Sequence, residues 1–387
     1  MESFATRPSP RLVGGPGSLR ELPDCIRRSG GGHALVVTDP GIVAAGHVGR
    51  AAALLSEAEI DFTVYDGTTE NPGESDITAA CDFARQVKVD CLVGLGGGSS
   101  MDTAKGCNFL LTNGGTMSDY KGYALARQPL LPFVAVPTTA GTGSECQSYA
   151  VISRDGSHEK MACGDPGALA TYAVLDPELT TSMPQQVAAL TALDALSHAL
   201  ETAVSTKRNP LSSAFSQEAF LRIASAVEPV LRGEASLEER GQMLLGSAFS
   251  GLAIENSMLG AAHASANPLT ARQGLAHGHA VALMLPHVMR YNDEDPAARA
   301  VYEQYGKLLS QRGYATLPVV EWVERLISLA ALPALAEAGV DRRDFPVLAE
   351  DATRQWTGQF NPRAMTEASF VLLYEAAMDV SSTSRAK

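Results

Sequence analysis

The segment Leu92–Lys105 reads LVGLGGGSSMDTAK, in which an apolar strand pattern runs directly into three glycines, two serines and the start of a helix. Glycines let the backbone approach a phosphate closely, and the amides at the following helix start point at it with the positive end of the helix dipole. The segment therefore predicts an anion cradle between a strand and a helix. A tight turn without a ligand has the same local pattern, so the glycine run is weak evidence by itself.

Around this segment, the first half of the chain alternates short β-branched runs with helical patterns. Such alternation predicts an α/β domain with a mainly parallel sheet, a Rossmann-like nucleotide-binding fold. The strand candidates are Ala34–Thr38, Phe62–Tyr65, Cys91–Gly94 and Phe133–Pro137, with shorter extended pieces near Tyr149–Ile152 and Tyr172–Asp176. Apolar residues at three-to-four spacing predict crossover helices over Gly46–Glu59 and Ser75–Lys88.

After Asp176-Pro177 the composition changes to Ala, Leu and Glu in long amphipathic stretches. We therefore expect an α/β domain over residues 1–182 and an all-α domain over residues 183–387. The predicted helices are Val187–Val204, Pro210–Leu231, Ser236–Ala264, a segment around His277–Met289, Pro296–Gly313 and Val319–Ala338. A cleft between two such domains is the default place for a ligand.

Composition excludes several classes of protein. The 387 residues carry 30 basic and 43 acidic side chains, a net charge of −13 that argues against binding to nucleic acid or to a membrane surface. The start of the chain lacks the pattern of an export signal, and no apolar run reaches the ~20 residues of a bilayer span, so we expect a cytoplasmic protein. The six cysteines form no CxxC pair and are predicted to be reduced and buried.

Two further patterns favour a nucleotide. Asp39 follows the first predicted strand, where an acidic group suits a ribose 2′-hydroxyl and favours NAD over NADP, although it is equally typical of a plain helix cap. Pro137–Glu145 reads PTTAGTGSE and places Thr138, Thr139, Thr142 and Ser144 directly after another strand. Alone, this run would more commonly be a loop that caps a helix.

A candidate metal site lies in the second half. Asp194 and His198 are four residues apart in a predicted helix, so both side chains point to one side. His263 is predicted at the end of another helix, and His277 opens HGHAVALMLPH after a loop. One carboxylate and three imidazoles make a complete ligand set for Fe²⁺ or Zn²⁺. Each histidine alone is more commonly structural, and sequence spacing does not bring the helices together.

The chain resembles the iron-containing (group III) alcohol dehydrogenases, which share a dehydroquinate synthase-like architecture. The resemblance rests on GGGSSMDTAK (Gly96–Lys105), PTTAGTGSE, the Asp194/His198 pair and the long segment from Gly260 to Asn292. It begins at RLVGGPGSLREL (Arg11–Leu22), includes ENP and LDPELT, and ends in FNPR (Phe360–Arg363). Several independent motifs in the family's order make chance agreement very unlikely.

The resemblance implies the residues that hold each cofactor. It implies that Asp194, His198, His263 and His277 bind one divalent metal, with Fe²⁺ favoured and Zn²⁺ the alternative. It implies NAD(P) contacts from Asp39, Asn71, Gly97, Gly98, Ser99, Asp102, Thr138, Thr139, Thr142, Ser144 and Lys160. It also implies an active site in the cleft between the domains and a homodimer or larger homo-oligomer.

The sequence departs from the family at one position. Many members carry a second histidine one turn after the third metal ligand, and here that position is Asn267, followed by Pro268. An amide does not exchange a proton near neutral pH, so the proton relay must use water, a ribose hydroxyl or another residue. His279 is a candidate replacement, although it sits two residues from a ligand and is expected to face elsewhere. Asn267 is alternatively a hydrogen-bonding partner for a polar substrate tail.

The resemblance implies a metal-dependent, NAD-linked oxidoreductase that interconverts a small alcohol and its aldehyde or ketone. A hydroxyacid-oxoacid transhydrogenase would retain its nucleotide and release no free NADH. A lyase of the dehydroquinate-synthase type would use a glutamate with two histidines and bind a polyanionic substrate through several basic residues. A binding protein without catalytic activity would not need all four ligands.

Overall fold

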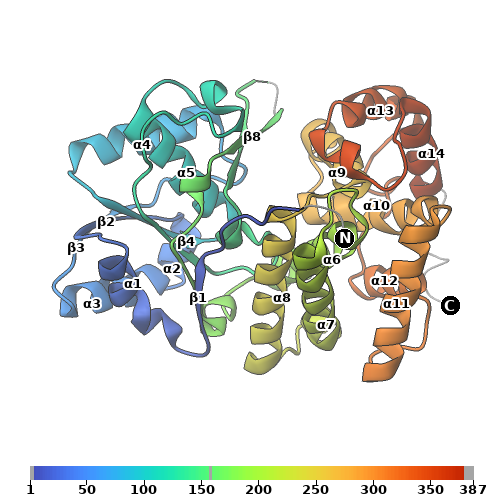
Figure 1. Cartoon of the computed structure of the whole chain (residues 1–387), viewed down its shortest axis with the longest axis horizontal. Coiled ribbons are helices and arrows are strands. Elements are labelled where there is room, and N and C mark those ends of the chain that lie inside the picture. Colours follow the sequence, from blue (N-terminus) through green and yellow to red (C-terminus); the bar gives the residue numbers. More distant parts are fainter. Residues whose placement is uncertain (1–3, 157–158, 379–387) are drawn as a thin grey trace. The chain divides into compact units, whose positions relative to one another are not determined.

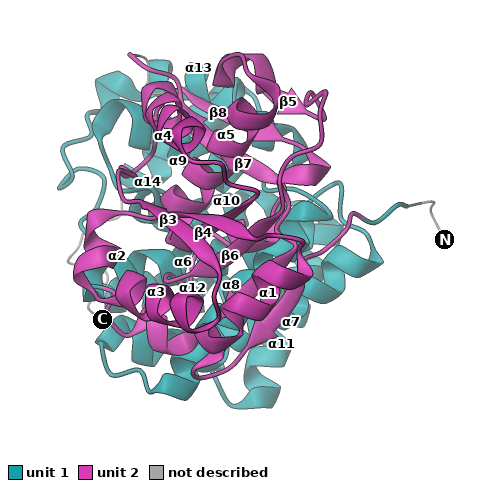
Figure 2. Cartoon of the chain, turned by 90° about the vertical axis from the view of Figure 1, so that its left-hand side faces the viewer, with its two compact units in different colours: residues 1–6, 184–387 teal, residues 7–183 magenta. Residues whose placement is uncertain are grey.

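The computed structural model describes residues 4–156 and 159–378 of the chain. These residues form two compact units (Figures 1 and 2). Of the described residues, one unit takes those between 7 and 183, and the other takes 184–378 together with 4–6. Each unit has its own core and is described separately below.

The unit of residues 7–183 is built on a six-stranded sheet in the order β1-β9-β6-β4-β2-β3, with every pairing parallel. The strands are β1 (Arg11–Gly14), β2 (His33–Val37), β3 (Asp61–Tyr65), β4 (Cys91–Gly96), β6 (Phe133–Pro137) and β9 (Tyr172–Leu175). Chain order reverses between β2 and β4, so the crevice at their carboxyl ends is the place where open α/β sheets bind ligands. The predicted Rossmann-like fold class is confirmed.

Helices cover both faces of this sheet, as in a doubly wound fold (Figure 2). On one face, α1 (Leu22–Arg28) and α3 (His47–Glu57) bury Leu22, Ile26 and Leu55 against alternate residues of the central strands. On the other face, α5 (Gly98–Asn113) packs against β4 and against α4 (Glu74–Gln86). The short α2 (Pro40–Ala44) follows β2.

A second, three-stranded sheet in the order β5-β8-β7 completes this unit. Its strands are β5 (Gly122–Tyr123), β7 (Tyr149–Ser153) and β8 (Lys160–Gly164), and the β7–β8 pair is antiparallel. The sequence predicted β7 and the four longer strands of the main sheet to within two residues at each end. It did not predict β1, β5 or β8, which are short or carry few β-branched residues.

Among its described residues, the other unit contains helices and no strands. Its helices are α6 (Gln185–Val204), α7 (Pro210–Arg232), α8 (Leu237–Glu255), α9 (Ala261–Gln273), α10 (His277–Asn292), α11 (Pro296–Arg312), α12 (Val319–Leu329), α13 (Phe345–Thr353) and α14 (Glu367–Met378). By length and composition α6 alone among the described helices is apolar enough to cross a membrane, but 83% of its apolar window is buried inside the protein. Such burial is what a core helix shows.

Two helix predictions were wrong in extent. The predicted helix Ser236–Ala264 is two helices, because α8 ends at Glu255 and α9 begins at Ala261. His263 therefore lies in the first turn of α9 and not at the end of a helix. The predicted helix Val319–Ala338 stops at Leu329, a few residues before Pro333, which cannot continue the helical hydrogen bonding.

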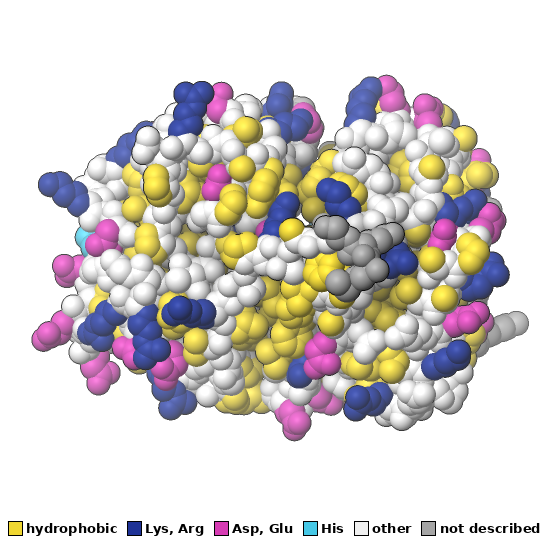
Figure 3. Space-filling model, viewed as in Figure 1, with side chains coloured by type: hydrophobic (Ala, Val, Ile, Leu, Met, Phe, Trp, Pro, Cys, Tyr) yellow, Lys and Arg dark blue, Asp and Glu magenta, His cyan; other side chains and the backbone are white. Residues whose placement is uncertain are grey.

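The surface and the cysteines agree with the composition. On the face drawn in Figure 3, acidic and basic side chains are interspersed and do not gather into one basic patch. All six cysteines are buried and free, which confirms that none is paired in a disulfide.

Candidate functional site

Helix α6 presents three ionisable side chains on one buried face. Asp194, His198 and Glu201 lie at positions i, i+4 and i+7, which a helix of 3.6 residues per turn brings onto the same side. Each of the three is 4% exposed. Alanines and leucines surround them along α6, so the helix buries these polar groups inside an otherwise apolar core. Buried groups of this kind require partners.

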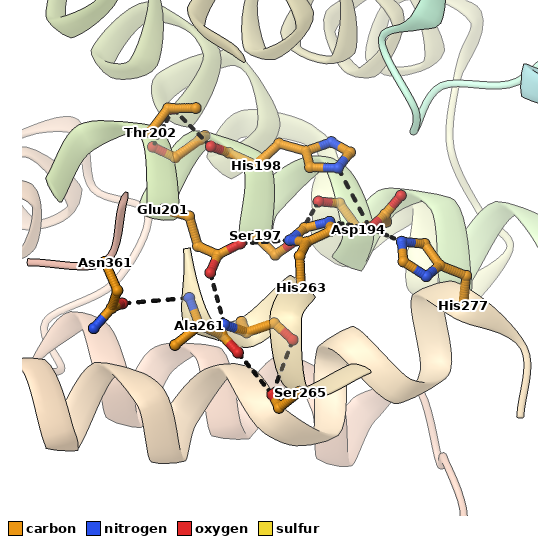
Figure 4. Close-up of polar contacts among 12 residues, drawn as sticks. Asp194, Ser197, His198, Glu201, Thr202, Ala261, His263, Ser265, His277 and Asn361 are labelled. Carbon is orange, nitrogen blue, oxygen red and sulfur yellow. Dashed lines mark hydrogen bonds and ion pairs between the residues drawn. The ribbon is translucent and has the colours of Figure 1, made fainter. Parts of the chain in front are cut away.

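Three imidazoles converge on one oxygen of Asp194 (Figure 4). Its Oδ1 atom lies 3.6 Å from Nε2 of His198, 3.4 Å from Nε2 of His263 and 3.9 Å from Nε2 of His277. The rings of His198 and His263 stack with their centroids 4.8 Å apart. Helices α6, α9 and α10 thus bring together the four residues that the sequence singled out.

The donor set fits a divalent cation. Asp194 Oδ1 and His263 Nε2 are buried, face each other and have no hydrogen-bond partner among the described residues. Asp194, His263 and His277 each offer one ligand atom, and these atoms lie within 4.8 Å of one another. One carboxylate oxygen and imidazole nitrogens suit Fe²⁺ or Zn²⁺. The side chain of His277 is 34% exposed against 5% for that of His263, so the cluster opens on the His277 side.

Opposite charges in the cluster shift the pKa values of Asp194 and His263 toward their charged forms. Burial acts to raise the pKa of Asp194, but the neighbouring His198, His263 and His277 outweigh burial and lower that pKa. Burial likewise acts to lower the pKa of His263, but Glu201 and Asp194 outweigh it and raise the pKa to about 9. A cation that binds here would compete with the proton on His263, because metal ligands must be deprotonated.

Glu201 is a member of the cluster that the sequence analysis missed. Its Oε2 atom contacts Nδ1 of His263, and its Oε1 atom accepts a hydrogen bond from the backbone N–H of Ala262 at 2.7 Å. The signal in the sequence was its place one turn after His198 on an apolar helix.

The FNPR motif also has a structural role. Oδ1 of Asn361 accepts a hydrogen bond from the backbone N–H of Ala261 at 3.3 Å, at the start of α9. Asn361 and Asn292 exchange two amide hydrogen bonds of 3.0 and 2.7 Å. Since Asn292 ends α10, this buried pair fixes the start of α9 relative to α10, and these helices carry His263 and His277.

In the α/β unit, the predicted nucleotide contacts gather at the carboxyl ends of neighbouring strands. Asp39 follows β2, the glycine turn follows β4, and Thr138 follows β6. Helix α5 begins after Gly97, which has no side chain to cap it, so its first backbone N–H groups have no side-chain acceptor at the helix start. Uncapped amides and the positive end of a helix dipole are the features with which helix starts bind anions.

The glycine turn, Gly96–Gly98, lies close to the hydroxyl-rich loop, Pro137–Glu145. A Cβ atom on Gly98 would lie 2.9 Å from Cγ2 of Thr142, and one on Gly97 would lie 3.3 Å from Cγ2 of Thr139. A Cβ on Gly98 would therefore force Thr142 or the turn to move, and one on Gly97 would make a tight contact with Thr139, so the two motifs form one surface.

Further predicted contacts join this surface. Asn71, in the left-handed region at φ 52°, donates from its backbone N–H to Oγ of Ser99 at 3.2 Å. Nζ of Lys160 donates to Oδ1 of Asn71 at 2.7 Å. Burial lowers the pKa of Lys160, although nearby Asp102 and Glu70 oppose this effect. Asn71, Ser99 and Lys160 therefore lie side by side.

Asp102 and Ser144 contact each other beside the buried Lys105. Oγ of Ser144 donates to Oδ1 of Asp102 at 3.2 Å and accepts from Nζ of Lys105 at 3.0 Å. Burial raises the pKa of Asp102 to about 6, against the opposing effect of Lys105 and Lys160. Lys105 also donates to the backbone carbonyls of Ser144, Gln147 and Tyr149. This buried lysine fastens the hydroxyl-rich loop to α5.

Asp39 is a helix cap in the structure. Its Oδ1 atom accepts a hydrogen bond from the backbone N–H of Ile42 at 3.1 Å, at the start of α2. Its Oδ2 atom lies 3.5 Å from Oγ of Ser100. Oδ1 of Asp39 therefore serves as the helix cap that the sequence also allowed, and Oδ2 points toward the glycine turn.

The two candidates for the proton relay have protein partners. Nδ2 of Asn267 donates to Oε1 of Gln355 at 2.9 Å. A ring nitrogen of His279 contacts the carbonyl oxygen of Pro333 at 2.8 Å. That contact directs His279 toward the segment after α12, as expected for a histidine two residues from a ligand.

Comparison with known proteins agrees with this geometry. The family "Iron-containing alcohol dehydrogenase" matches residues 9–177, and "Fe-containing alcohol dehydrogenase family, C-terminal" matches residues 188–378. Alcohol dehydrogenase 4 of Schizosaccharomyces pombe is 33% identical over 365 residues, covering 94% of this chain and 86% of the relative. NAD-dependent methanol dehydrogenase of Bacillus methanolicus is 31% identical over 376 residues, covering 95% and 98%.

A solved structure is similar over the same length. The crystal structure of a 1,3-propanediol oxidoreductase superposes with a TM-score of 0.91 at 31% identity, covering 97% of this chain and all of that one. The two family matches, the relatives and the similar solved structure lead to the same conclusion: this chain belongs to the iron-containing alcohol dehydrogenase family.

Proposed function

We propose that this chain catalyses the NAD-linked interconversion of a small alcohol and its aldehyde or ketone, using a divalent metal held by Asp194, His198, His263 and His277. The observation that carries the proposal is the convergence of three imidazoles on one buried oxygen of Asp194 that has no hydrogen-bond partner among the described residues. Fe²⁺ is the favoured ion and Zn²⁺ the alternative, since this ligand set suits both.

The four proposed ligands have different roles in the metal site. When bound, the ion supplies Lewis-acid stabilisation of the negative charge that develops on the alcohol oxygen. Asp194 contributes the negative charge of the site, and the buried His198 and His263 exclude water from one side of it. His277 leaves the opposite side open, where the substrate enters.

The nucleotide would bind in the α/β unit. The first-turn amides of α5 would hold the pyrophosphate, and Thr138, Thr139 and Thr142 would offer hydroxyls along the neighbouring loop. Asp39 would accept a hydrogen bond from a ribose hydroxyl, which favours NAD over NADP because a 2′-phosphate would meet a like charge. The Bacillus methanolicus relative, which is named as NAD-dependent, supports this choice.

The proton of the alcohol does not pass through the side chain of Asn267. Its amide does not titrate near neutral pH, and its Nδ2 atom already donates to Gln355. His279 is engaged with Pro333. We therefore propose that the proton leaves to water on the open side of the cluster, beside His277.

The test uses protein loaded anaerobically with Fe²⁺ or Zn²⁺ and a panel of alcohols with neutral, anionic and diol tails. Free NADH should accumulate with at least one small alcohol, and His277→Ala should lower kcat/KM by at least about 100-fold. Hydride transfer between two organic substrates without free NADH would instead identify a transhydrogenase. Consumption of a substrate without net oxidation would identify a lyase.

A further inference from the structure

Glu201 is a buried carboxylate that is not one of the proposed metal ligands. It projects from α6, and both of its oxygens reach the first turn of α9 (Figure 4). Oε1 accepts from the N–H of Ala262 at 2.7 Å, and Oε2 contacts Nδ1 of His263. A carboxylate with both oxygens occupied in a buried setting has a defined orientation.

One of its contacts replaces a missing helix cap. Gly260, the N-cap of α9, offers no side-chain acceptor. The carboxylate of Glu201 supplies that acceptor from another helix, and its charge also complements the positive end of the α9 dipole. A Cβ atom on Gly260 would lie 3.1 Å from Oε1 of Glu201, a tight contact that the glycine avoids.

The other contact determines which ring nitrogen of His263 is protonated. An ionised carboxylate only accepts hydrogen bonds, so the Nδ1 atom beside it carries the proton. When a metal ion displaces the proton from Nε2, the lone pair of that atom, which faces Oδ1 of Asp194 at 3.4 Å, is available to the ion. Partners of this kind orient metal-binding histidines and increase their basicity.

We propose that Glu201 is a positioning residue that fixes the Nδ1–H tautomer and the ring orientation of His263 for metal binding. This inference rests on the proposed metal site. Glu201 itself offers no atom to the metal, because both of its oxygens face α9.

The substitution Glu201→Gln separates the two roles. Its amide oxygen can still accept from Ala262, so α9 keeps its cap. Its NH₂ group then faces Nδ1 of His263 and forces that nitrogen to accept, which moves the ring proton to Nε2. The nitrogen needed for the metal then donates to Asp194 instead. Turning the amide over would place two donors, the NH₂ group and the Ala262 N–H, against each other.

The experiment titrates metal-free protein with Zn²⁺ against a competing chelator at fixed pH. We expect Glu201→Gln to weaken Zn²⁺ binding by 10- to 100-fold, in roughly the range seen for lost histidine partners. The carboxylate of Glu201→Asp still only accepts hydrogen bonds, so this variant should bind Zn²⁺ more tightly than Glu201→Gln. The control is Glu145→Gln, the same change at a buried glutamate of the other unit, which should bind Zn²⁺ like the wild type.

The outcomes separate this inference from the metal site itself. If Asp194→Asn binds Zn²⁺ as tightly as the wild type, the proposed metal site is wrong. If Asp194→Asn loses Zn²⁺ but Glu201→Gln binds within twofold of the wild type, the role of Glu201 is wrong.

A second readout remains available even where a variant does not fold. Nitrogen-15 NMR of the Zn²⁺-loaded wild type, labelled at histidine, should show the His263 proton on Nδ1. A proton on Nε2 of that ring would overturn the inference.

Discussion

Nε2 of His263 lies 3.4 Å from Oδ1 of Asp194, and neither atom has a hydrogen-bond partner among the described residues. Two ligands bound at ~2.05 Å to one tetrahedral ion are separated by about 3.4 Å. The separation of these two atoms is therefore that of atoms sharing an ion. The distances of 3.6 and 3.9 Å from the same oxygen to His198 and His277 require only small adjustments.

Metal binding should stabilise the helical unit. An ion at about 100 times its Kd adds ~2.7 kcal/mol to the free energy of unfolding, equivalent to a rise in Tm on the order of 5 °C. Calorimetry of metal-free protein with and without Fe²⁺ or Zn²⁺ measures this rise. Asp194→Asn should abolish it, and an equal rise in that variant would place the ion elsewhere.

Asp39→Ser should change the nucleotide preference without removing the helix cap. A serine hydroxyl can still accept from the N–H of Ile42, while the carboxylate charge is lost. The kcat/KM with NAD should fall roughly 10- to 100-fold, the value of a charged hydrogen bond, and the ratio of NADP to NAD activity should rise. Asp39→Ala, which removes the cap as well, should show an added loss in Tm. An unchanged cofactor ratio in Asp39→Ser would show that Asp39 is only a cap.

Gly98→Ala should impair nucleotide binding, because the added Cβ would lie 2.9 Å from Thr142. The turn must then move away from the hydroxyl-rich loop, and we expect Kd for NADH to rise at least about tenfold, or 1.4 kcal/mol. NADH fluorescence titration measures it. Gly49→Ala is the matched control, since a Cβ at that helical position meets nothing within 4 Å. Its Kd should be unchanged, and its stability should rise by up to ~1 kcal/mol. Equal NADH affinity in both variants would contradict the proposed anion site.

Glu145 should make stability depend on pH. Burial raises the pKa of this carboxyl to about 7 in the folded chain, from an ordinary value of 4.5. The folded state therefore binds a proton that the unfolded state releases between these values, so the free energy of unfolding should fall as pH rises from about 4.5 to about 7. Glu145→Gln removes this titration. The variant should match the wild type at low pH and exceed its stability by on the order of 2–3 kcal/mol above pH 7.5. Denaturant unfolding at several pH values tests this, and parallel profiles would refute it.

Local sequence patterns were sufficient to predict the elements that depend on contacts between residues close in the sequence. The β-branched runs predicted β2, β3, β4 and β6, and the spacing of Asp194 and His198 placed both on one face of α6. The proposed metal ligands were identified from their spacing together with the family resemblance. In the structure, Nε2 of each of the three histidines lies within 3.9 Å of Oδ1 of Asp194.

Long-range contacts explain what the sequence did not predict. The start of α9 depends on Glu201 and Asn361, which lie 61 residues before and 100 residues after the N–H groups that they cap. No local signal at Gly260 shows this, so the pattern suggested one helix from α8 into α9. Glu201 was overlooked for the same reason, because its partner His263 is 62 residues away.

The most direct test of the account is anomalous diffraction at the metal absorption edge from crystals of the Fe²⁺- or Zn²⁺-loaded protein. We predict one strong peak in each molecule, within bonding distance of Asp194, His198, His263 and His277. A fully active crystal with no anomalous peak among these four side chains would contradict it.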